Sequence, residues 1–189
     1  MTKSIALTTV LSLALTAVAI GQGSQAANES LWEAARAGDT ARITAALSQG
    51  ANVNAKSRYD VTALFFAASS GRLDAVKLLV TRGADVNAED TFYHAHAADM
   101  ALGNGHSDVA VFLVQSGANA DGVLTAGVQT NDEAVVRAAV AGKVTRQGLQ
   151  SAIGMAGAMK RESLVPVIKT ALDKLPPETA APAFAVDPA

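Results

Sequence analysis

The stretch Asp60–Asp90, which reads DVTALFFAASSGRLDAVKLLVTRGADVNAED, contains the pattern that recurs along the rest of the chain. It contains two short apolar segments separated by Gly71, and it ends on the polar turn GADVN that begins at Gly83. Thr62 is a favourable N-cap for the first segment, and a glycine can end a helix within one residue because it tolerates positive φ. In the second segment apolar residues recur at helical spacing. The stretch therefore predicts two short helices followed by an extended turn.

Copies of this stretch recur along the chain. About 33 residues earlier, LWEAARAGD at 31–39 matches LFFAASSGR at 64–72, and GANVN at 50–54 matches GADVN. About 34 residues later, ALGNGHSDV at 101–109 matches AASSGRLDA at 67–75. A fixed period of this size indicates a helical repeat array. One such unit cannot bury its apolar face alone, so neighbouring units must stack to form the core.

The repeated motifs resemble the ankyrin repeat. The resemblance rests on TALF from Thr62, AAxxG ending at Gly71, VKLL from Val76 and GADVN from Gly83, all repeated in register. The family's Thr-Pro-Leu-His is replaced here by Thr-Ala-Leu-Phe, which loosens the helix start without breaking the pattern. We expect an all-α ankyrin-repeat solenoid of about five helix pairs, with β-hairpin-like turns between the first three.

The sequence predicts three segments: a signal peptide at 1–26, a repeat domain at 27–175 and a flexible tail at 176–189. The repeats are expected near residues 28–57, 58–90, 91–120, 121–147 and 148–175. The fourth and fifth lack the GADVN turn, as expected of terminal repeats that seal the core. In the fifth, Pro166 fits the first turn of a helix that has Ser163 as its N-cap.

The two ends of the chain differ from the repeats. The leader has one early charge, Lys3, then an uncharged apolar run, then a short polar stretch with a plausible cut before Ala27. The run is shorter than the roughly 20 residues of a spanning helix, so export with cleavage is favoured over retention as an anchor. The tail has four of the five prolines of the chain, which favours a flexible segment. The alternative is that the tail is an extended strand that docks on the domain through Phe184.

Several classes of chemistry find no support in the sequence. The chain has no cysteine, no GxSxG elbow and no phosphate-binding glycine loop, and its net charge of −2 gives no electrostatic footprint for nucleic acid. We therefore expect no catalytic residues, no cofactor and no nucleic-acid partner. His94, His96 and Asp99 leave a metal-binding alternative open. The alternative interpretation is that His96 and Asp99 cap the first helix of the third repeat.

Aromatic residues gather where the hairpin tips are expected. The sequences of the tips are KSRY at 56–59 and DTFYH at 90–94. A solvent-exposed turn without a binding role would more often contain Gly, Asn or Ser. Exposed aromatics beside an arginine are typical of an interface hot spot. The competing interpretation is that the rings only pack on one another. The expected partner-binding residues are Arg58, Tyr59, Phe66, Phe92, Tyr93, His94 and Met100.

The resemblance to ankyrin repeats implies a function in binding. Such arrays present hairpin tips and first helices as one concave face, so we expect a non-catalytic, monomeric module whose partner is another protein. Small exported members of the family resemble bacterial periplasmic factors that support an envelope or stress-defence enzyme. An inhibitor or immunity-type protein that blocks an enzyme is the alternative. A periplasmic or secreted location, without a membrane span after signal cleavage, is expected from the leader.

Overall fold

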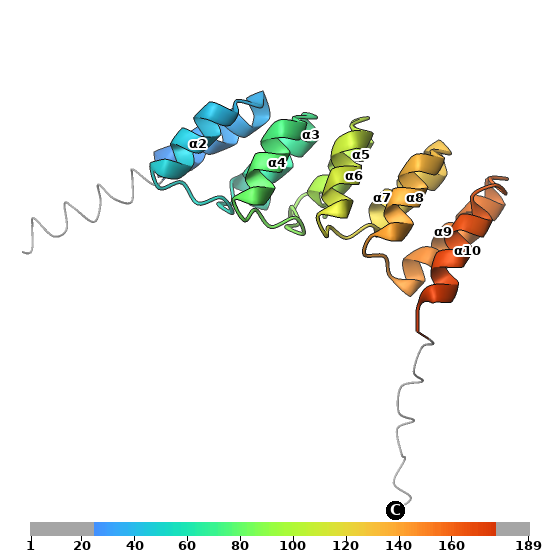
Figure 1. The fold of residues 1–189 in the computed structure, drawn as a ribbon. Helices are drawn as coiled ribbons and strands as arrows, with labels where there is room; N and C mark the ends of the chain where they lie inside the picture. The colour runs from blue at the N-terminus through green and yellow to red at the C-terminus, as the bar shows by residue number, and fades with distance from the viewer. Residues whose placement is uncertain (1–24, 177–189) are drawn as a thin grey trace, which may run out of the picture.

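The computed structural model describes residues 25–176. These residues form consecutive pairs of short antiparallel helices that stack side by side along one direction (Figure 1). The first pair consists of a helix covering residues 25–37 and α2 (Thr40–Ser48). The following pairs are α3 (Ala63–Ser69) with α4 (Leu73–Thr81), α5 (Ala97–Gly103) with α6 (Ser107–Gln115), α7 (Asp121–Thr130) with α8 (Glu133–Ala141), and α9 (Arg146–Ala158) with α10 (Val165–Lys174). The predicted solenoid of five helix pairs is confirmed.

The helices form two rows. The first helices of successive pairs contact one another, α3 with α5, α5 with α7 and α7 with α9. The second helices do the same along the other row, from α2 through α4, α6 and α8 to α10. The connections between pairs all leave from the same side of the array (Figure 1). The described residues contain no β-strand, and the hairpin-like turns hold only isolated bridges such as Glu89 with His96.

Helix starts and ends follow the local chemistry of the repeat. Thr62 is the N-cap of α3, and its hydroxyl accepts a hydrogen bond from Phe65 N at 3.3 Å. Gly71, with φ +67°, separates α3 from α4, and Gly83, with φ +84°, follows α4. A Cβ at Gly71 would lie 2.5 Å from Nδ1 of His106 in the next repeat. This position therefore requires glycine for its conformation and also for its space.

The core is one continuous layer between the two rows. Small residues such as Ala67, Ala68 and Ala101 are fully buried, and they let neighbouring first helices approach closely. Leucines such as Leu79 and Leu113 on the second helices fill the remaining volume. Fully burying each leucine contributes about 1.5–3 kcal/mol relative to leaving it exposed. Stacking of the units thus provides the apolar burial that a single unit lacks.

Asparagine side chains connect successive turns. Asn54 accepts from Asp85 N at 2.8 Å through Oδ1 and donates to Gly83 O at 3.1 Å through Nδ2. One repeat later Asn87 accepts from Asn119 N at 2.7 Å and donates to Gly117 O at 3.4 Å. These asparagines end the GANVN and GADVN motifs. Each of these asparagines therefore fixes the start of the next turn. In a β-sheet, the backbone hydrogen bonds of a ladder would do this.

The last repeat corrects one expectation from the sequence. The N-cap of α10 is Leu164, and Ser163 lies before it. Leu164 is buried, with 1% of its surface exposed, and its amide closes a turn on Arg161 O at 3.0 Å. Burial of this leucine sets the start of the helix one residue later than a serine cap would. Pro166 does lie in the first turn, where its missing N–H has no helical partner.

The predicted leader and tail fall mainly on residues 1–24 and 177–189, outside the described part of the chain. Within 25–176, no helix is long and apolar enough to cross a membrane.

Candidate partner-binding surface

The first hairpin tip is built around a strained turn. Tyr59 has φ 66° and Asp60 has φ 59°, both in the left-handed region, within the 3₁₀ segment Arg58–Asp60. The amide of Ser57 donates to Val61 O at 2.9 Å, which closes the loop. Lys56 Nζ lies 3.2 Å from Asp60 Oδ2. Non-glycine residues rarely adopt this conformation, and such positions are concentrated at functional sites.

The second hairpin tip is folded around Asp90. The side chain of this residue is almost fully buried and accepts three backbone hydrogen bonds, from Tyr93 N at 2.7 Å, Phe92 N at 2.9 Å and Ala95 N at 3.0 Å. Burial by itself raises the pKa of the Asp90 carboxyl. The three backbone donors, together with the charge of His94, outweigh burial and hold the pKa below its usual value. Asp90 therefore stays ionised and fixes the backbone that presents Phe92 and Tyr93.

The two tips meet in one group of side chains. The Tyr59 and Phe92 ring centroids are 5.5 Å apart, and those of Phe92 and Tyr93 are 4.6 Å apart at 83°. The guanidinium of Arg58 lies 4.9 Å from the centroid of the Tyr59 ring. The three rings are nevertheless exposed, by 48% for Tyr59, 60% for Phe92 and 68% for Tyr93. We refer to Arg58, Tyr59, Phe92 and Tyr93 as the tip cluster.

The other predicted binding residues lie apart from these stacking contacts. Phe66, on α3, is half-buried, and the guanidinium of Arg36 stacks 4.4 Å from its ring centroid. Met100, on α5, is half-buried against the core. His94 is exposed with φ 54°, and its Nδ1 lies 2.8 Å from Glu89 Oε1. The structure thus brings four of the seven predicted residues into one cluster.

The histidine cluster that left a metal site open is divided between two pairs. His96 is the N-cap of α5, and Asp99 Oδ2 lies 3.2 Å from both the backbone N and Nδ1 of His96. This is the capping arrangement that the sequence analysis gave as the alternative to metal binding. His94 pairs instead with Glu89. Within residues 25–176, no group of three or more His, Cys, Asp or Glu side chains is placed to hold a metal ion.

Two features of this surface were not predicted from the sequence. The amide of Thr91 donates to Tyr59 O at 2.9 Å and so joins the two tips directly. Asp90 organises the second tip from beneath. A sequence signal for Asp90 did exist, because Asp side chains commonly accept from amides two and three residues ahead. The contact between Thr91 and Tyr59 joins separate repeats and has no local signal.

The fold and its turns define a class, the solenoids built from helical repeats. The family model of ankyrin repeats, in three copies, matches residues 8–90 and 31–123, which together cover more than half of the chain. The chain belongs to the ankyrin-repeat family. Such arrays are protein-interaction modules, and their fold is typically non-catalytic. The first match begins inside the segment that the sequence assigns to a leader.

Curated relatives match only part of this chain. The chain is 45% identical over 62 residues to the human (Homo sapiens) mitochondrial disaggregase, covering 33% of this chain and 9% of that protein. It is 37% identical over 82 residues to the Bos taurus mitochondrial disaggregase, covering 43% of this chain and 12% of that protein. The chain therefore spans about a tenth of the length of the curated relatives that it matches.

Proposed function

We propose that this protein binds a protein client through the tip cluster. The observation that carries the proposal is the exposure of three adjacent aromatic rings, joined by an arginine, on two turns whose backbone is already fixed. Aromatic and arginine side chains dominate the binding energy of protein interfaces. A surface that is ordered before binding loses less conformational entropy when a partner docks.

The way the rings are held supports a binding role over mutual packing alone. If the rings only stabilised the fold, we would expect them to bury one another or to cover the helices beneath them. Phe92 contacts Tyr59 in a tilted arrangement and Tyr93 edge-to-face, yet all three side chains keep about half or more of their surface in solvent. The left-handed conformation of Tyr59 adds an energetic cost that ordinary turn residues would avoid. Both features are expected of a surface kept ready for a partner.

We further propose that the client is met in the bacterial periplasm or outside the cell. The leader-like segment at 1–26 supports this location, as does the absence of cysteine, which leaves the chain indifferent to an oxidising compartment. The client envisaged is an envelope or stress-defence enzyme. Sequencing the N-terminus of the protein from the periplasmic fraction tests the location. A protein that begins at Met1 and stays in the cytoplasm would contradict it.

Site-specific photo-crosslinking tests the binding surface. A photoreactive amino acid is placed at Thr91, between the exposed rings, and in a control at Lys77, which is exposed on α4. We expect a client to crosslink from position 91 and not from position 77. Crosslinks from position 77 alone would place the interface on the second helices and refute the tip cluster.

The activity of the crosslinked client then separates support from inhibition. An enzyme whose stability or turnover rises when this protein is added is a supported client. An enzyme that loses turnover in proportion to occupancy is the target of an inhibitor, which is the alternative function. Either result identifies the interface, because the crosslink position is independent of the sign of the effect.

A further inference from the structure

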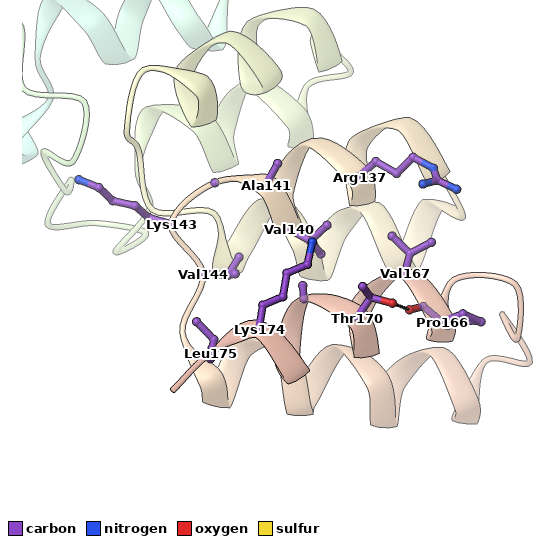
Figure 2. A pocket seen from close by; sticks show the side chains of 12 residues that line it. Arg137, Val140, Ala141, Lys143, Val144, Pro166, Val167, Thr170, Lys174 and Leu175 are labelled. Carbon is purple, nitrogen blue, oxygen red and sulfur yellow. Dashed lines mark hydrogen bonds between the residues drawn. The ribbon is translucent and has the colours of Figure 1, made fainter. Parts of the chain in front are cut away.

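A groove runs between α8 and α10, on the row of second helices at the end of the array. It has a volume of about 770 Å³, against about 330 Å³ for the hollow beside α6 and α8. Figure 2 shows the groove from close by, with Val140 on α8 facing Val167 and Thr170 on α10. Its apolar walls consist of partly buried side chains, namely Val140, Val144, Val167, Ala171 and Leu175.

The charged side chains around the groove are cationic. Arg137, Lys143 and Lys174 line it, and no acidic residue of the described range 25–176 does. Lys174 extends across the opening toward Val140, whereas Lys143 points away toward the neighbouring loop (Figure 2). Arg137 is paired with Glu133, with Nη2 to Oε1 at 2.6 Å. Among the described residues, no carboxylate lies within 4.0 Å of Lys174, so its charge is available at the groove mouth.

The chain leaves the described fold at the rim of this groove. Lys174 and Leu175 are lining residues, and Arg146 holds the exit by donating through Nη2 to Leu175 O at 3.3 Å and Pro176 O at 2.5 Å. The sequence that follows, from Pro177, is PETAAPAFAVDPA. It carries Glu178 and Asp187 with no Lys or Arg, and its large apolar side chains are Phe184 and Val186.

We propose that residues 177–189 dock into the groove between α8 and α10 of the same molecule, with Phe184 on its apolar wall. The segment complements the groove in charge, because it is acidic and the cation left unpaired at the groove mouth, among the described residues, is Lys174. It is also long enough. Phe184 is nine residues beyond Leu175 and can reach about 30 Å, whereas the ten residues of α10 span about 15 Å. The segment can therefore turn back from its exit and still cover the whole groove.

Docking also accounts for the exposed apolar wall. The last two units leave five apolar side chains partly open to solvent at the groove between their second helices. A segment that buries these side chains, and turns its alanines and prolines outward, covers the apolar strip between the last two units. This role is independent of the tip cluster, which lies several repeats away.

A single nitroxide label tests the proposal. The natural chain has no cysteine, so Ala185→Cys in the chain as purified from cells provides one unique attachment point. We expect the label to remove most of the amide NMR intensity of groove residues such as Val140, Val167 and Thr170. Amides of α2, at the other end of the array, should keep theirs (Figure 1). Groove signals that keep full intensity would overturn the proposal.

Three further measurements test which chain occupies the groove and which of its residues hold it there. Mixing labelled protein with an unlabelled, isotope-enriched copy reveals docking between molecules, and groove broadening in that mixture alone would overturn docking within one chain. Phe184→Ala should restore the groove signals by removing the apolar anchor. Lys174→Glu should weaken docking by about fivefold or less, as expected of an exposed ion pair, and Glu178→Lys in the same chain should restore it. Broadening that survives Phe184→Ala unchanged would refute the anchor.

Discussion

Thr91 and Tyr59 join two repeats through a backbone hydrogen bond, with the Thr91 amide donating to the Tyr59 carbonyl at 2.9 Å. The same two tips are joined by the contact between the rings of Tyr59 and Phe92, which are tilted by 60° relative to one another. The hydrogen bond fixes the distance between the tips of the first and second turns. The exposed aromatic surface is consequently formed by two repeats together. A substitution in either turn should therefore change the conformation or stability of the other.

The first prediction concerns energetic coupling between these tips. Tyr59→Ala and Phe92→Ala each remove one ring of a contacting aromatic pair, so the double variant should lose less stability than the two single variants added together. We expect a coupling free energy of about 0.5–1 kcal/mol, within the range for aromatic pairs. Urea unfolding of the four proteins in the double-mutant cycle measures it. Additive losses would show that the rings do not stabilise one another.

The second prediction concerns Asp90 and pH. Its pKa is lower in the folded state than in the unfolded state, where it is about 3.9, so its carboxylate stabilises the fold at and above neutral pH. This contribution is lost as the pH falls through the folded-state pKa. Asp90→Asn should therefore cost about 1–3 kcal/mol at pH 7 and progressively less below about pH 4.

The matched control for Asp90 is Asp74→Asn, because Asp74 is exposed in the first turn of α4. Its effect on the free energy of unfolding should be small at either pH. Equal losses for Asp90→Asn at pH 7 and in acid would contradict a role for the ionised carboxylate.

The third prediction concerns Gly71. Gly71→Ala introduces a Cβ at positive φ and places it 2.5 Å from His106 Nδ1, whereas Gly83→Ala meets the same conformational cost in open space. The conformational cost is about 1–2 kcal/mol in both variants. Gly71→Ala should therefore lower the free energy of unfolding by clearly more than Gly83→Ala. Truncating the ring with His106→Ala in the same chain should recover part of that difference, and no recovery would show that the ring is not the obstacle.

The fourth prediction concerns the asparagine connections. Asn87→Ala removes two side-chain hydrogen bonds, one that Asn87 accepts from Asn119 N and one that it donates to Gly117 O. Because both bonds are on the exposed side of the turns, we expect a loss of about 1–2 kcal/mol. Hydrogen exchange should become faster first at the Asn119 amide and the turn around it. Protection that falls equally in all repeats would argue against a local connection.

The repeat pattern was readable from the sequence because it depends on local chemistry. Thr62 as a cap, Gly71 at positive φ and the alanines of the first helices are each required by contacts within one repeat or its copy. The start of α10 was misplaced because burial of Leu164, a tertiary effect, overrode the capping preference of Ser163. Local propensity is a weak guide where tertiary packing decides.

The candidate binding surface was predictable only in part for the same reason. The aromatic composition of the tips indicated Tyr59, Phe92 and Tyr93, and the structure groups them. Phe66 and Met100 were placed on the same face by the repeat register, but one stacks under Arg36 and the other packs on the core. Register fixes the helix face of a residue. It does not fix which neighbour the side chain meets.

The central claim is that the tip cluster binds the client. The most direct test is the dissociation constant of the purified client for the natural chain and for the combined variant Tyr59→Ser, Phe92→Ser and Tyr93→Ser. Met159→Ser is the control, since Met159 is an exposed apolar residue far along the array. We predict at least a hundredfold weaker binding for the combined variant with unchanged helical circular dichroism, and no change for the control. Unchanged affinity of the combined variant would contradict the account.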